Sequence, residues 1–157
     1  MPPQTLYDIT GIDLNRIVYD QEAIREMNPQ RGHMEMLDAI VHAKPEEGQI
    51  IGYKDVKPDE FWVEGHIPGR PLFPGVMMIE AGAQLASFYT KKFLKLDGFI
   101  GFGAVDGVKF RGQVLPGARM YLIGQKTWYR HRRIGCNIQG MVDGTLVFEC
   151  QITGVQL

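Results

Sequence analysis

Residues 65–94 read GHIPGRPLFPGVMMIEAGAQLASFYTKKFL, and this stretch decides the fold. Six of its first eleven residues are Gly or Pro, although the whole chain of 157 residues holds only 19 Gly and 9 Pro. Proline lacks the backbone N–H that helices and inner strands need, so we predict a stiff, irregular loop over 65–75. The first 15 residues of 75–94 are almost wholly apolar. A helix that is apolar all round is buried, so we predict one long, central, buried helix.

Strand patterns lie on both sides of this helix. Before it, we predict two strands over 36–43 and 49–56, joined by a turn at 44–48, and a short extended piece at 61–63. After it, we predict strands over 99–105, 107–115, 118–130, 133–142 and 145–155. One helix between mostly antiparallel strands predicts the α+β class, with a sheet wrapped around the helix. We expect a single domain over 1–157, in which 1–23 is an N-terminal lead-in and 13–27 has loose helical spacing.

The last two strands predict a hairpin around Asp143-Gly144. A three-residue loop would place Val142 opposite Leu146 and Ile138 opposite Cys150, which matches apolar to apolar, so we prefer it to a two-residue loop. In that register Cys136 and Cys150 are diagonal neighbours about 7–8 Å apart, at or beyond the limit for a disulfide. We therefore expect two reduced, buried cysteines.

Composition excludes several classes of protein. The formal net charge of −1 argues against nucleic acid as the main ligand. The sequence contains no run of about 20 apolar residues, so we predict no membrane span. The start of the chain lacks the features of a signal peptide. We therefore expect a cytoplasmic protein. The histidines have no metal-ligand spacing, and no nucleotide motif occurs, so we expect neither a metal nor another cofactor.

Three groups around the start of the predicted helix can carry chemistry. The loop holds His66, and the helix holds one carboxylate, Glu80, with Gln84 one turn further on the same face. Pro74 and Gly75 begin the helix, whose free N–H groups can bind a negative oxygen. The plainer alternatives are a hydrogen-bonded loop histidine and a surface glutamate. A base, an acid and an oxyanion donor in an apolar site would suit proton abstraction next to a carbonyl.

The run GHIPGRPLFPGV at 65–76, followed by Ile79-Glu80-Ala81 and Ala83-Gln84, closely resembles the 3-hydroxyacyl-[acyl-carrier-protein] dehydratases of FabZ type. Further matches, in the same order, are VKFR at 108–111, VLPG at 114–117 and VDG at 142–144. The resemblance covers roughly residues 24–154. It implies a hot-dog fold and a hydro-lyase that makes trans-2-enoyl thioesters in type II fatty acid synthesis or a related lipid or polyketide pathway.

The resemblance also implies the role of each site residue. His66 would take the proton from C2 of the acyl thioester, Glu80 would handle the departing 3-hydroxyl, and the Gly75 N–H would polarise the thioester carbonyl. Gln84 would have either a structural role beside Glu80 or the role of orienting it. The expected substrate-binding residues are Pro74, Val76, Met77, Gln84 and Phe110. His66 and Glu80 would come from the two chains of a homodimer, which can assemble further into a trimer of dimers.

The chain departs from the family pattern at 31–36, which reads RGHMEM, and at Gly82 in the helix. These changes leave the acyl chain length and the pathway open. A basic cluster at 130–133, RHRR, is either a solvated turn or a docking patch for acidic acyl carrier protein. The alternative functions are a hot-dog acyl thioesterase and a non-catalytic acyl-binding protein.

Overall fold

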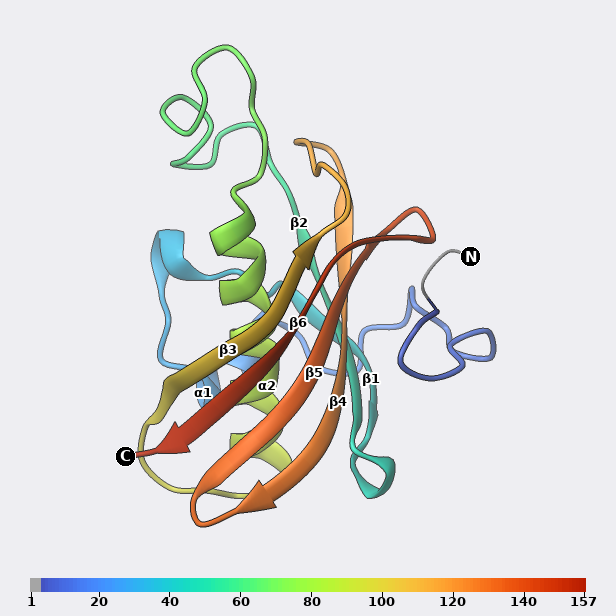
Figure 1. The fold of residues 1–157 in the computed structure, drawn as a ribbon, viewed down its shortest axis with the longest axis vertical. Helices are drawn as coiled ribbons and strands as arrows, with labels where there is room; N and C mark the ends of the chain where they lie inside the picture. Colours follow the sequence, from blue (N-terminus) through green and yellow to red (C-terminus); the bar gives the residue numbers. More distant parts are fainter. Residues whose placement is uncertain (1–3) are drawn as a thin grey trace.

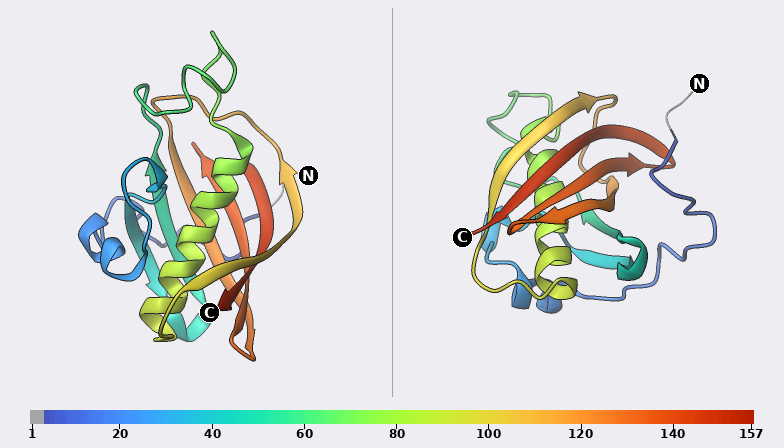
Figure 2. Two further views of the ribbon diagram at one scale, coloured as in Figure 1. Left: turned by 90° about the vertical axis from the view of Figure 1, so that its left-hand side faces the viewer. Right: turned by 60° about the horizontal axis from the view of Figure 1, so that its bottom comes forward.

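The computed structural model describes residues 4–157, so the first three residues of the expected lead-in lie outside the described part. The sequence folds into a six-stranded antiparallel sheet in the order β1-β2-β4-β5-β6-β3. The sheet curves around the long helix α2 (Gly75–Phe93), as Figures 1 and 2 show. The predicted α+β class and the central helix are confirmed.

The strands keep most of the predicted positions. Their bounds are β1 Ala39–Lys44, β2 Gln49–Asp55, β3 Ile100–Phe110, β4 Arg119–Arg130, β5 Arg133–Val142 and β6 Thr145–Gln156. A short helix α1 (Gln21–Met27) and two 3-10 turns, Gly32–Met34 and Pro45–Glu47, complete the regular structure of the described residues.

Three predicted elements are wrong. Residues 99–105 and 107–115 are not two strands: β3 is one strand that continues through Gly107, whose φ of +59° lies within an irregularity in its pairing with β6. The chain then becomes irregular. The 61–63 segment is a turn. The helix predicted over 13–27 is confined to α1, because the Asp20 side chain caps it by accepting from the Ala23 N–H.

The β5–β6 hairpin corrects our register argument. The loop has two residues, and Val142 pairs with Thr145 instead of Leu146. The register shifts by one residue between Gly140 and Met141, because a bulge there inserts one extra residue into one strand. Beyond the bulge, the strands have the apolar pairing that we predicted. Ile138 therefore lies opposite Cys150, as predicted. Both cysteines are free and buried.

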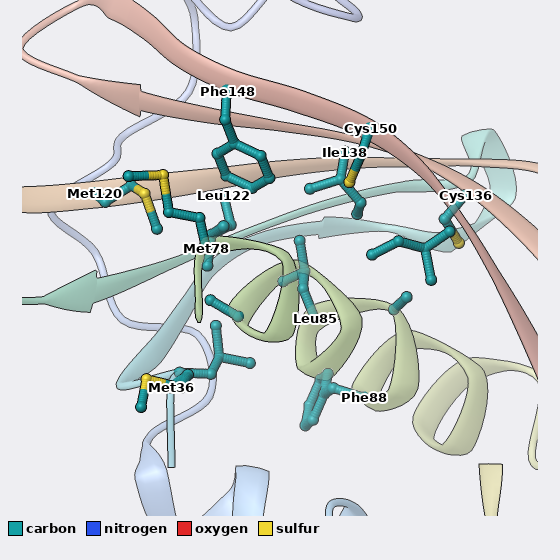
Figure 3. Close-up of a cluster of buried hydrophobic side chains, with 14 of the residues drawn as sticks. Met36, Met78, Leu85, Phe88, Met120, Leu122, Cys136, Ile138, Phe148 and Cys150 are labelled. Carbon is teal, nitrogen blue, oxygen red and sulfur yellow. The ribbon is translucent and has the colours of Figure 1, made fainter. Parts of the chain in front are cut away.

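The main core fills the space between α2 and the concave face of the sheet. Leu85 of α2 is fully buried there and points toward Ile138 and Phe148 of the last strands, whereas Phe88 points to the other side of the helix (Figure 3) and packs against Tyr19 and Phe93. A Cβ at Gly82 would lie 2.8 Å from the Ile138 Cγ2 methyl. The glycine that we singled out in the helix is therefore required by close packing against β5.

The lead-in covers the opposite, convex face of the sheet. Leu6, Ile9 and Leu14 pack on a second apolar cluster, and the single hydrogen of the Tyr7 hydroxyl is shared between the carbonyl oxygens of Ile50 and Gly124 at 2.9 and 3.1 Å. The Gln139 amide bonds to the backbone of Gln4 and Leu6. We call residues 4–14 the strap. It closes a face of the sheet that would otherwise expose apolar side chains.

Candidate active site

The loop 65–75, which contains His66, leads into the N-terminal end of α2 and extends beyond it (Figure 1). The imidazole is exposed, and its Nδ1 lies 2.8 Å from the Leu72 carbonyl oxygen. A carbonyl oxygen can only accept, so Nδ1 carries the hydrogen, and in the neutral ring the lone pair is then on Nε2. His66 is thus held in the tautomer that a general base requires.

The start of α2 is shaped by a close contact with β3. Pro74 is buried at the N-cap, and its carbonyl oxygen accepts from the N–H groups of Met77 and Met78. A Cβ at Gly75 would lie 2.7 Å from the ring of Phe110, so a larger residue there would have to displace this ring. Within residues 4–157 the N–H groups of Gly75 and Val76 have no hydrogen-bond partner. They can serve as donors to an oxyanion.

Gln84 connects α2 to the segment before β1. It is 2% exposed, and its Nε2 donates to the Met34 carbonyl oxygen at 2.6 Å and to Oε1 of Glu80 at 3.0 Å. Its own Oε1 accepts from the Met36 N–H at 2.9 Å. All the polar atoms of this amide are used, and one of its bonds orients the Glu80 carboxylate.

Glu80 faces a groove of about 230 Å³ between α2 and the strands β3, β5 and β6. Small residues of α2, Ala83, Ala86 and Ser87, line the groove below the carboxylate. The remaining side of the groove is mainly apolar and includes Phe99, Ile100, Phe102, Ile134 and Ile152. An acyl chain fits such a lining.

Gln30 also lines this groove, and the sequence reasoning missed it. Its Oε1 is buried and has no hydrogen-bond partner among the described residues. The residue lies between α1 and the first 3-10 turn, where no periodic pattern marks a site. The one signal in the sequence was that Gln30 directly precedes segment 31–36, which departs from the family pattern.

A single chain does not join all the expected site residues. Gly75 contacts Phe110, and Glu80 contacts Gln84, but His66 and Glu80 share no hydrogen bond in the described part of the chain. Met77 is half-buried and packs against the main core.

The surface around these residues is open and apolar. Val76 is 71% exposed, although we expected the helix to be buried all round. Phe102 and Phe110 are about half exposed on β3, which is an edge strand of the sheet. The start of α2 around Val76 and the edge of β3 are therefore uncovered in a single chain.

The basic cluster 130–133 forms the tight turn between β4 and β5, with positive φ at His131 and Arg132. Figure 1 places this turn at the opposite end of the sheet from the His66 loop. Exposed Trp128 and Tyr129 precede it. Among the described residues, no helix has the length and apolarity to cross a membrane.

Comparison with known proteins supports the resemblance. The family model of the FabA-like domain matches residues 28–151. The 3-hydroxyacyl-[acyl-carrier-protein] dehydratases FabZ of Listeria welshimeri and Listeria monocytogenes are each 32% identical over 135 residues, covering 85% of this chain and 92% of theirs.

Solved structures share the fold at low sequence identity. A chain of the dehydratase heterocomplex ApeI:P from Xenorhabdus doucetiae has a TM-score of 0.72 and 14% identity, covering 85% of this chain and 90% of that one. A thioesterase superfamily member from Thermus thermophilus has a TM-score of 0.59 and 16% identity, covering 68% and 79%. These likenesses confirm the expected hot-dog fold and carry no information about the reaction.

Proposed function

The chain belongs to the FabA-like domain family, and on that premise we propose that it dehydrates 3-hydroxyacyl thioesters of acyl carrier protein to trans-2-enoyl thioesters. The observation that carries the proposal is the Glu80 carboxylate, held by Gln84 at the end of an apolar groove. The family relatives act on the same class of thioester by name.

The proposed reaction is a syn or anti loss of water that needs one base and one acid. Nε2 of His66 takes the proton from C2, and the C2 electrons form the new double bond as the bond from C3 to the hydroxyl breaks. The carboxyl group of Glu80 gives a proton to the leaving hydroxyl, which departs as water. The free N–H of Gly75 binds the thioester oxygen while it gains negative charge.

We propose that His66 of one protomer and Glu80 of its partner form each site of a homodimer. The open edge of β3 supports this, because an unpaired strand edge with exposed apolar side chains is a template for pairing with a second copy. The exposed Val76 at the start of α2 supports the same pairing. Further assembly to a trimer of dimers stays a proposal that measurement of the particle mass tests.

The basic turn 130–133 is our candidate docking patch for the carrier protein. Its three arginines form no ion pair within residues 4–157, so their charge is available to an acidic partner. Such charges mainly raise the association rate. We also propose a single domain over 1–157 and a cytoplasmic location, which the free thiols of Cys136 and Cys150 support.

The test is hydration of a crotonyl thioester on carrier protein, followed by loss of the enone absorbance. His66→Ala and Glu80→Ala should each abolish the reaction, and full activity in both would refute the mechanism. Release of free thiol instead of hydration would identify a thioesterase, and tight binding without turnover a non-catalytic acyl-binding protein.

Mixing the two inactive variants tests the shared site. After co-refolding, about half the dimers contain one chain of each variant, and each of these has one intact site out of two, so about a quarter of the parent activity should return. If His66 and Glu80 acted within one chain, no activity would return.

A further inference from the structure

The groove beside Glu80 continues into a second, basic cleft. The cleft has a volume of about 290 Å³ and shares Ser87, Phe99 and Ile100 with the groove. Its lining includes Lys91, eleven residues after Glu80 on α2. At about 1.5 Å of rise per residue, Glu80 and Lys91 lie about 16 Å apart along the helix axis.

The cations of this cleft are fixed in place but only partly neutralised. Arg25 is paired with Glu35 at 2.8 Å. The Arg31 guanidinium instead donates to the carbonyl oxygens of Asn28, Gln30 and Arg25 at 2.7 to 2.9 Å, and Lys91 Nζ donates to the Gly98 carbonyl oxygen at 2.6 Å.

Neither Arg31 nor Lys91 forms an ion pair in the described part of the chain. The side chains lining the cleft include one carboxylate, Glu26, against three cations. A guanidinium has five N–H donors and an ammonium three, so both groups keep donors free for a ligand. The cleft is thus suited to an anion.

Two buried acceptors accompany these cations. Asn28 is 3% exposed, and its Nδ2 donates to the Gln84 carbonyl oxygen at 2.9 Å, which leaves Oδ1 without a partner. Oε1 of Gln30 is likewise buried and unpaired among the described residues. Asn28 lines the cleft and Gln30 the groove, so a ligand with N–H or O–H donors along its length would pair them.

We propose that this cleft binds an anionic group which the acyl thioester carries about 16 Å from the reacting carbons, with Arg31 and Lys91 as its cations. The inference rests on the proposed function, because it takes Glu80 as the position of those carbons. Two parts of the substrate are possible sources of the anion. One is the phosphate of the carrier protein's pantetheine arm, and the other is a carboxylate at the far end of the acyl chain.

Calorimetric binding to the full chain tests the proposal without relying on turnover. The probes are two matched pairs: an acyl-pantetheine with and without its terminal phosphate, and a medium-chain acyl-pantetheine with and without a terminal carboxylate. In one pair the anionic member should bind about tenfold more tightly, which corresponds to about 1.4 kcal/mol. Added salt should reduce this preference. The pair that responds identifies the source.

Lys91→Met should reduce the preference to about threefold or less, and Lys91→Glu should abolish or reverse it, because it places a negative charge in the cleft. Lys92→Met is the matched control, since Lys92 lies over the Tyr19 ring and does not line the cleft. Equal binding within both pairs, or a preference unchanged in both Lys91 variants, overturns the inference. Failure of the proposed function alone would appear as an intact anion preference without hydration of the crotonyl thioester.

Discussion

Replacing Gln84 by Leu should both destabilise the fold and impair catalysis. Leucine has nearly the same volume but cannot accept from the Met36 N–H, which lies in a residue that is 1% exposed. A buried donor without a partner costs about 1–3 kcal/mol, so we expect a loss of about 2 kcal/mol in the free energy of unfolding. For a domain of this size each kcal/mol lowers the Tm by about 2–4 °C, which gives about 4–8 °C in calorimetry.

The kinetic effect has a separate origin. Without the bond from Gln84 Nε2, which is 3.0 Å long, the Glu80 carboxylate is free to rotate away from the reacting hydroxyl. Misplacement of a catalytic group by about 1 Å can cost up to about 100-fold, so we expect kcat to fall at least tenfold with little change in KM. Steady-state hydration of the crotonyl thioester measures both constants.

Ser87→Ala is the matched control for this variant. Ser87 lines the same groove on the same helix, and its side chain makes no hydrogen bond to another described residue. It should change stability by no more than about 0.5 kcal/mol. If Gln84→Leu melted within about 1 °C of the parent, or if Ser87→Ala lost as much, the amide network would not have the role that we give it.

Three further outcomes follow from the packing and the titrating groups. Gly82→Ala gains about 1 kcal/mol of helix propensity, but its Cβ is forced against Ile138, which costs about 1–3 kcal/mol. Urea unfolding should therefore show a lower free energy of unfolding than in the parent. A higher value would mean that the Ile138 side chain moves aside at little cost. Burial raises the pKa of the Cys136 and Cys150 thiols to about 12, so a thiol reagent at about pH 8 should label neither in the native protein and both in guanidinium; native labelling would contradict their burial. Burial also raises the pKa of Asp38, so its contribution to stability is present below the unfolded-state pKa and is lost as the pH rises through the folded-state value. The difference in melting temperature between Asp38→Asn and the parent should therefore shift in favour of the variant between about pH 4 and neutral pH. A difference that stays constant over this range would refute this.

Sequence reasoning succeeded where the pattern is local. The apolar run of α2 and the alternation in β5 and β6 are set by residues within each element, and both were predicted closely. The hairpin loop was predicted wrongly because a bulge near Gly140 compensates for the shorter turn, and alternation alone cannot distinguish these solutions.

The residues of the site were predictable from the sequence, but the contacts that join and cover them were not. An apolar sequence indicates that the helix surface around Val76 is covered in the folded protein. It does not indicate whether the same chain or a second copy covers it. The Gln84 network joins residues about 50 positions apart, and no periodicity encodes such a contact. Gln30 escaped notice for the same reason.

The strap has a consequence for the order in which the protein matures on the ribosome. The strap is synthesised before the sheet that it covers, but the side chain that binds the Leu6 backbone belongs to Gln139, 133 positions later. At about 5–20 residues per second, roughly 7–27 s pass between the synthesis of these two residues. The strap therefore docks only after the strands that follow it have been made, and until it does, the convex face of the nascent sheet is exposed to chaperones and to other unfinished chains.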